Sequence, residues 1–283
     1  MRWRKGRRSS NIEDRRGQRM GRGVKLGGGV TIIAIVAALF LGQDPGAILS
    51  ILDGLQQHTG PPSTSNTAGP NDEASNFVSV VLADTEDTWS SLFSAADQRY
   101  QPPKLVLYSD VVQSACGTNS AASGPFYCPP DQRVYLDLSF LKELQRMGAS
   151  GDFAMAYVIA HEIGHHVQNL VGVSAQVRQL QSRSSQSDAN ALSVLTELQA
   201  DCYAGVWAHH GHRQRNILEQ GDVEEAIDAA AAVGDDRLQK AAGRSVHPDS
   251  FTHGSSEQRI HWFSVGLKGG DIKSCDTFEL ARG

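Results

Sequence analysis

The sequence predicts an α+β fold that is mostly helical, with a small β-sheet and one N-terminal membrane anchor ahead of a single domain. Three observations lead to this prediction. Several stretches after residue 75 repeat apolar residues at helical spacing. Two runs rich in β-branched and aromatic residues, KLVLYSD and RVYLDLSF, are typical of short strands. Near the N-terminus, a basic block runs into an uncharged apolar stretch.

The N-terminal segment predicts a signal anchor. Residues 1–25 contain ten Lys and Arg against Glu13 and Asp14, and residues 26–43 carry no charge. Eighteen residues are just long enough to cross a membrane. The preceding arginines and the poor cleavage site favour an anchor over a cleaved signal peptide, with residues 1–25 in the cytoplasm. The domain is then expected at the outer face of the cytoplasmic membrane.

The charge of the remaining chain argues against a nucleic-acid partner. The whole chain has a net charge of −5, of which residues 1–25 contribute +8, so the rest carries −13. A folded part with this charge would repel phosphate. We therefore expect no role in nucleic-acid binding.

The rest of the chain divides into a linker and one domain. Residues 44–75 are rich in Pro, Ser, Thr and Gly and predict a flexible linker, whereas residues 76–283 predict one folded unit. In that unit we expect helices over residues 76–100, 139–147, 152–170, 188–210 and 223–233, and one that starts at Ser255 with Gln258 completing a capping box. The polar residues 172–187 could form a lid or a surface loop.

The four cysteines are expected to form two disulfides. An even number in an exported chain favours disulfides over metal binding, and the sequence contains no CxxC motif. Four cysteines allow three connectivities. Pairing Cys116 with Cys128 is the most economical, and Cys202 with Cys275 would then tie the C-terminal tail to the domain. Four free, buried thiols are the alternative.

The stretch AYVIAHEIGHHVQNL predicts a metal site. His161 and His165 are four residues apart, so on a helix they lie on one face and can bind one zinc ion. Glu162 lies beside them and can take a proton from a water at the metal, as in the HExxH arrangement. The apolar residues before His161 indicate that this helix is buried. His166 points elsewhere and is expected to support the site or lie at the surface.

A third metal ligand is expected about thirty residues downstream, in LTELQADCYAGVWAHH. Glu197 and Asp201 are four residues apart in a largely apolar helix, so one can bind the metal while the other accepts the N–H of a ligand histidine. A structural salt-bridge pair is the alternative interpretation. His209, His210 and His212 are rival ligands at the end of this helix.

The motifs HEIGHHVQNL, ELQADCYAGVWAHH, FTHGSSEQRIHWF and CDTF resemble the bacterial, membrane-anchored neutral zinc metallopeptidases over nearly the whole chain. The resemblance implies a zincin-like domain with a glutamate as third zinc ligand, acting on a peptide or protein substrate. It implies that Zn²⁺ is bound by the side chains His161, His165 and Glu197. It also implies that Glu162 is the general base and that Asp201 orients a histidine.

An oxyanion formed during hydrolysis needs a donor besides the metal. His253, in a turn before the last long helix, is the first candidate, although a histidine there could simply bond local backbone. His247 and Tyr203 are weaker candidates, and Tyr127 could line a cleft or belong to the core. Two other functions stay open, a non-catalytic zinc-containing scaffold in the cell envelope and a hydrolase of a non-peptide cell-wall amide.

Overall fold

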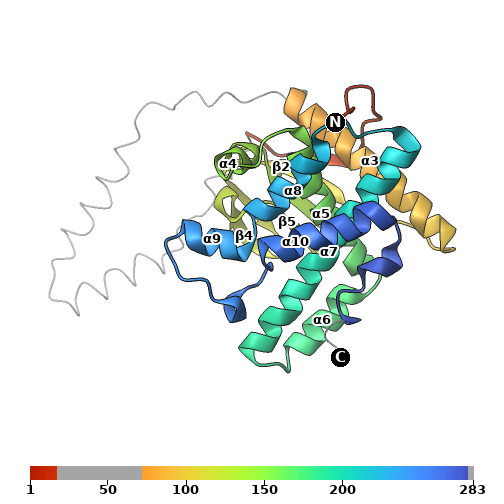
Figure 1. Cartoon of the computed structure of the whole chain (residues 1–283). Coiled ribbons are helices and arrows are strands. Elements are labelled where there is room, and N and C mark those ends of the chain that lie inside the picture. The colour runs from red at the N-terminus through yellow and green to blue at the C-terminus, as the bar shows by residue number, and fades with distance from the viewer. Residues whose placement is uncertain (18–71, 280–283) are drawn as a thin grey trace, which may run out of the picture. The chain divides into compact units, whose positions relative to one another are not determined.

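The computed structural model of the chain describes residues 1–17 and 72–279. These residues form a mostly helical domain with small sheets, as Figure 1 shows, which confirms the α+β prediction. The predicted anchor at residues 26–43 and nearly all of the linker at 44–75 lie outside the described residues. Among the residues that are described, no helix is both long and apolar enough to cross a membrane.

The helices follow the order expected from the sequence, with two additions. Helices α6 and α9 lie in segments where no helix was expected, and α7 starts and ends beyond its predicted limits. The α-helices are α3 (Glu73–Ala95), α4 (Phe140–Arg146), α5 (Asp152–Leu170), α6 (Val173–Gln181), α7 (Gln186–Arg215), α8 (Asp222–Ala232), α9 (Asp235–Ala241) and α10 (Ser256–Gly269). The capping box at Ser255 and Gln258 is present.

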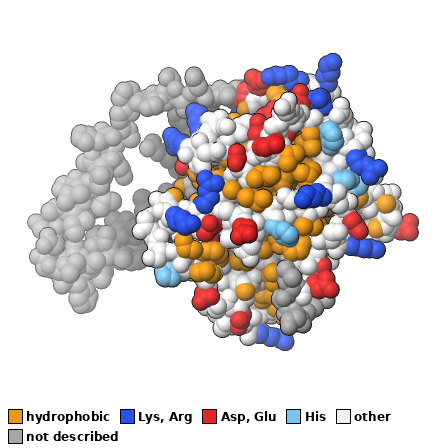
Figure 2. Space-filling model, viewed as in Figure 1, with side chains coloured by type: hydrophobic (Ala, Val, Ile, Leu, Met, Phe, Trp, Pro, Cys, Tyr) orange, Lys and Arg blue, Asp and Glu red, His pale blue; other side chains and the backbone are white. Residues whose placement is uncertain are grey.

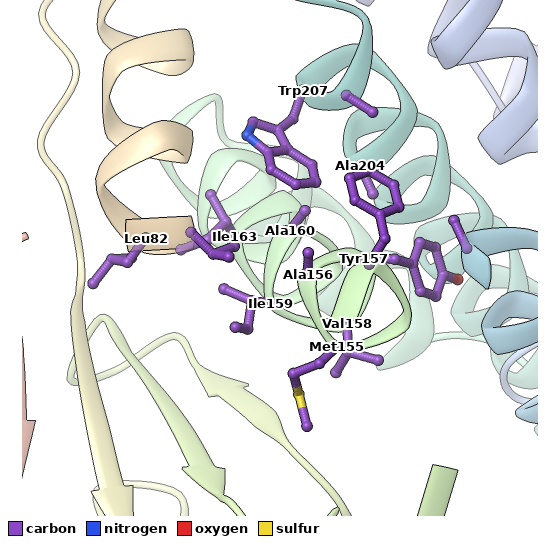
Figure 3. Close-up of a cluster of buried hydrophobic side chains, with 14 of the residues drawn as sticks. Leu82, Met155, Ala156, Tyr157, Val158, Ile159, Ala160, Ile163, Ala204 and Trp207 are labelled. Atoms are coloured by element: carbon purple, nitrogen blue, oxygen red, sulfur yellow. The ribbon is translucent and has the colours of Figure 1, made fainter. Parts of the chain in front are cut away.

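Helix α5 forms the centre of the domain. Between Phe153 and Ala160 it is apolar on all sides, and a helix of this kind must be covered all round. Figure 3 shows side chains from other helices against it, Leu82 of α3 on one side and Ala204 and Trp207 of α7 on another. Because α5 cannot move without exposing this apolar surface, its polar residues are held in fixed positions.

The main sheet has four strands in the order β1-β2-β6-β5. Strands β2 (Lys104–Tyr108) and β6 (Arg133–Asp137) are the two predicted from sequence, and they pair in parallel. Strand β5 (Phe126–Cys128) pairs antiparallel with β6, and residues of this sheet pack against α5. A separate hairpin consists of β3 (Val111–Ser114) and β4 (Gly117–Ser120).

The N-terminal residues belong to the domain. Strand β1 (Ile12–Asp14) pairs in parallel with β2, and the Trp3 ring packs edge-on against Phe77. Met1–Arg15 belong to the same compact unit as the chain that resumes at Asp72. The predicted boundaries, a basic tail at 1–25 separate from a domain at 76–283, are therefore corrected. The hydrophobic and strand-forming residues of this segment are too few to show a pattern. Its basic charge was therefore the only clear signal, and the sequence did not indicate that it folds with the domain.

Part of the N-terminal charge is used in ion pairs with the domain. Arg7 donates to Glu86 and Asp87 of α3, and Glu86 also accepts hydrogen bonds from Ser9 and Asn11. The Met1 α-ammonium group contacts Asp152 and Asp222. On the face shown in Figure 2, acidic and basic side chains are interspersed rather than gathered in areas of one sign.

Both predicted disulfides are confirmed. Cys116 is bonded to Cys128, which braces the segment between β3 and β6, and Cys202 of α7 is bonded to Cys275 in the C-terminal segment. These bonds account for all four cysteines of the chain. The alternative of free, buried thiols is therefore wrong.

Helices α7 and α10 touch backbone to backbone. A Cβ atom added at Gly266 would lie 2.0 Å from the carbonyl oxygen of Cys202, and one added at Gly205 would lie 2.1 Å from that of Phe263. Side chains at these two positions would force the helices apart. The close crossing fixes the position of α7 from the side opposite to α5.

We predict that Gly266→Ala lowers the free energy of unfolding by about 3 kcal/mol or more, because the new methyl group overlaps backbone atoms that cannot move aside. Thermal unfolding followed by circular dichroism measures the effect. Gly269→Ala on the same helix is the control, since its Cβ would meet only the Ser274 hydroxyl oxygen at 3.9 Å. Equal melting temperatures for the two variants would contradict the close crossing.

Candidate metal centre

The site lies at a close approach between α5 and α7. A Cβ atom at Gly164 of α5 would lie 3.0 Å from the carbonyl oxygen of Ala200 in α7. Glycine at this position lets the two backbones come close enough for side chains from both helices to share one site. Gly164 stands between His161 and His165, and Ala200 between Glu197 and Asp201.

Three side chains direct potential ligand atoms to one point. The Nε2 atom of His161 is 3.1 Å from a carboxylate oxygen of Glu197, and Nε2 of His165 is 3.3 Å from the other. The donor atoms of all three residues lie within 4.8 Å of one another. Ligand atoms at about 2.0–2.1 Å from a tetrahedral zinc ion lie about 3.3 Å apart, so this donor set fits a zinc ion.

Buried hydrogen bonds orient both imidazoles. The Nδ1 atom of His161 donates to Asp201 at 2.8 Å, and Nδ1 of His165 donates to the Gln168 side-chain oxygen at 2.8 Å. When the imidazoles are neutral, each ring therefore presents the lone pair of Nε2 toward Glu197. Fixing the tautomer in this way is the usual support of a histidine ligand. Asp201 thus contacts His161, one of the two histidines that the sequence predicted as ligands.

Asp201 is itself held by a buried arginine. It is fully buried, and Arg259 of α10, which is 3% exposed, donates Nε and Nη2 to its two carboxylate oxygens. The Tyr157 hydroxyl also donates to Asp201. Burial alone would raise the pKa of Asp201, but the charges and hydrogen bonds of Arg259 and His161 together outweigh it and keep that pKa below its usual range. Asp201 therefore remains a carboxylate that can only accept.

The charges around the site leave room for a divalent cation. Three buried or largely buried carboxylates, Glu162, Glu197 and Asp201, face one guanidinium, that of Arg259. Two positive charges are missing if both imidazoles are neutral. Burial lowers the pKa of both histidines, but the carboxylates outweigh it, raising the pKa of His161 to about 10 and that of His165 as well. Without a metal ion, one extra proton on each of the two histidines can supply the two missing positive charges. Binding of a divalent cation would release these protons.

Glu162 lies beside the ligand set without joining it. Its side chain is 8% exposed and accepts no hydrogen bond from any residue that the structure describes. Burial raises its pKa, although the nearby histidines pull in the opposite direction. A buried carboxylate with unused acceptor positions and a raised pKa can take up a proton from a neighbouring water.

His253 reaches the same region from the turn before α10. Gly254, the next residue, packs against Val194 and Leu198 of α7, and the charge of Glu197 acts on His253. Asp235 accepts hydrogen bonds from the backbone N–H groups of Thr252, His253 and Gly254. Its other oxygen is 3.3 Å from Nδ1 of His253. The Asp235 carboxylate raises the pKa of His253, so this ring holds a proton at higher pH than a free histidine.

The other histidines that the sequence offered as candidates lie away from the ligand set. His166 is fully buried rather than at the surface. It donates Nε2–H to the Gln101 carbonyl and accepts at Nδ1 from the Tyr127 hydroxyl, and burial lowers its pKa to about 4. His209 and His210 contact the carbonyl oxygens of Leu267 and Gly270. His212 and His247 are exposed, and Tyr203 packs in the core against Trp89.

A cleft of about 330 Å³ opens beside His165 and Glu197. One wall is α6, formed by part of the polar segment that the sequence left as a lid or a surface loop. Its residues Ser174, Val177, Arg178 and Gln181 follow helical spacing and line the cleft. Tyr127 also lines the cleft and belongs to the packing around His166. Substrate could reach the metal ligands through this opening.

Two histidines one turn apart, a glutamate from the next long helix and a second, unliganded glutamate form the arrangement of HExxH metal hydrolases. Comparison with known families agrees. Residues 1–278 match the family described as "Putative neutral zinc metallopeptidase", and the chain belongs to this family.

Relatives cover most of the chain. The "Uncharacterized protein YpfJ" of Escherichia coli K12 is 48% identical over 288 aligned positions, which cover 98% of this chain and 99% of the relative. The "Uncharacterized protein Rv2575" of Mycobacterium tuberculosis H37Rv is 40% identical over 257 positions, 86% of each chain. No solved structure matches the chain significantly.

Sequence reasoning missed three residues that support the site. Arg259, Gln168 and Asp235 each contact a predicted site residue through a hydrogen bond. Gln168 follows His165 by three residues on the same helix face, so helical spacing could have indicated it. Arg259 and Asp235 come from distant segments, and their contacts appear only in the folded chain.

We predict that Arg259→Met lowers the free energy of unfolding by about 3–5 kcal/mol, because Asp201 would remain buried without a cation. We expect zinc affinity to fall about 10–100-fold, since His161 loses its fixed support. Denaturant titration and competition with a chelator measure these effects.

The exposed Arg213 of α7 offers the matched control Arg213→Met, which should change neither quantity. The double variant Asp201→Asn/Arg259→Met should regain part of the stability, because neither buried charge remains. An Arg259→Met protein that binds zinc as tightly as the unaltered protein would contradict a positioning role for this residue.

Proposed function

We propose that the protein is a zinc-dependent peptidase that hydrolyses peptide bonds by activating a water molecule. One observation supports this above the others: Glu162 is buried beside the convergent His161, His165 and Glu197 side chains and is not used in any hydrogen bond among the described residues. A structural metal site has no need of such a carboxylate. The fold is proposed to be zincin-like, because the motif helix α5 packs against the sheet on one side and against the glutamate helix α7 on another.

The proposed chemistry assigns a task to each side chain. When bound to His161, His165 and Glu197, zinc supplies a Lewis acid that polarises a carbonyl group and lowers the pKa of water. Glu162 takes the proton of the attacking water and passes it to the leaving nitrogen. His253, whose pKa is raised by the Asp235 carboxylate, donates to the developing oxyanion in its protonated form. Asp201 and Gln168 hold the imidazoles in place.

We propose that the domain lies outside the cytoplasm and is attached to the cytoplasmic membrane. The two disulfides favour a compartment outside the cytoplasm, where such bonds persist. The uncharged residues 26–43 favour attachment to the cytoplasmic membrane, as the sequence suggested.

We predict that Glu162→Gln keeps the zinc site but lowers peptide hydrolysis about 100-fold or more, because an amide cannot accept the proton. The full chain and the variant are compared by elemental analysis and by cleavage of a broad peptide library. One zinc ion in each protein, with cleavage only by the unaltered chain, is the expected result. If both bind zinc and neither cleaves peptides, the envelope scaffold or a non-peptide cell-wall amide becomes the better interpretation.

We predict that Asp235→Asn moves the alkaline limb of the kcat/KM profile to lower pH. The carboxylate raises the pKa of His253, so its removal lets the imidazolium lose its proton at lower pH. The profile is recorded again in the His253→Gln background, where Asp235→Asn should no longer move the limb. The same displacement in that background would assign the titration to another group.

A further inference from the structure

The cleft beside the metal ligands contains a cation that is not neutralised by the protein. Of the charged residues that line it, only Arg178 is positive, and the others are the ligands His165 and Glu197. No acidic side chain from the described residues pairs with the Arg178 guanidinium. Its helix, α6, is anchored through the buried Val177. The Arg178 side chain is exposed to solvent at the cleft wall.

The surrounding segment strengthens this local positive charge. Residues 173–187 contain Arg178 and Arg183 but no Asp or Glu, although the chain as a whole has a net charge of −5. The other residues that α6 contributes to the cleft are Ser174, Val177 and Gln181, which are uncharged. The carboxylate of Glu197 is directed toward His161 and His165. The part of the cleft beside Arg178 therefore attracts anions.

We propose that Arg178 is a specificity-determining residue that binds a carboxylate of the substrate, and that the enzyme prefers peptides with a negative charge near the cleaved bond. This inference rests on the proposed peptidase function. The planar guanidinium can form two parallel hydrogen bonds to a carboxylate, which favours this anion over a neutral amide of the same shape. An acidic side chain and a free C-terminus offer the same chemistry, and the experiment separates them.

Binding is measured without catalysis, in the full-length, zinc-loaded chain that carries Glu162→Gln. The probes are fluorescein-labelled octapeptides in which one Glu moves along a neutral background, with a matching set that has Gln instead. Each peptide is prepared as the free acid and as the C-terminal amide. Fluorescence anisotropy gives Kd for this protein and for versions that also carry Arg178→Gln or, as the matched control, Arg183→Gln.

We expect Glu at one position to bind about tenfold more tightly than Gln, or every free acid to bind about tenfold more tightly than its amide. The first pattern identifies an acidic side chain and the second a terminal carboxylate. Arg178→Gln should abolish the difference, whereas Arg183→Gln, outside the cleft, should retain it. Equal binding of charged and neutral peptides, no binding at all, or a preference that survives Arg178→Gln would overturn the inference.

Cleavage of the same peptides by the chain with Glu162 intact separates this inference from the proposed function. Cleavage without any preference for charge would leave the peptidase standing and reject the role of Arg178. Binding that depends on Arg178, without cleavage of any peptide, would support the role of Arg178 and reject the peptidase.

Discussion

The buried charge balance between α5, α7 and α10 is the constraint on which the rest of the site depends. Each helix brings charge that it could not bury alone: Glu162 from α5, Glu197 and Asp201 from α7, and Arg259 from α10. Isolated burial of any one of them would cost several kcal/mol. The three helices therefore have to pack so that their buried charges lie next to charges of opposite sign. The apolar surface of α5 and the glycine crossing of α7 with α10 hold them there.

The sequence could predict that the candidate ligands lie together, because the information for this is local. His161 and His165 share a helix face through spacing alone, and Glu197 and Asp201 repeat that spacing on the next long helix. The capping box at Ser255 and both disulfides also follow from residue type and order. The residues that could not be predicted from the sequence are those that contact the site from distant segments of the chain. Nothing near Arg259 or Asp235 in the chain indicates Asp201 or His253 as a partner.

The errors in the predicted fold have a common cause, which is polar composition. Residues 173–181 include three glutamines and bury only Val177, so the short apolar stripe of Val173, Val177 and Leu180 lies in a segment that is polar on average. Residues 12–14 form a strand of three residues inside a basic segment, where charge is the stronger signal. In both cases neighbouring elements stabilise the segment. For β1 these are the backbone of β2 and the acidic residues of α3.

Hydrogen bonds between side-chain amides connect the C-terminal disulfide to the metal site. Gln199 donates to the carbonyl oxygen of Cys275 and accepts from Gln168, which in turn accepts from His165. Cys275 is held by its bond to Cys202. A continuous series of hydrogen bonds thus connects His165 to the disulfide near the end of the chain. This explains why a short tail with little apolar surface is part of the site's architecture.

The pairing of β1 with β2 makes the start of the chain the outer edge of the main sheet. Without Ile12–Asp14, the backbone N–H and C=O groups of Leu105–Leu107 would form an exposed edge, where another extended chain can pair. A strand of only three residues, two of them acidic, is a much poorer template for such pairing. The start of the chain therefore protects the sheet against association with other chains.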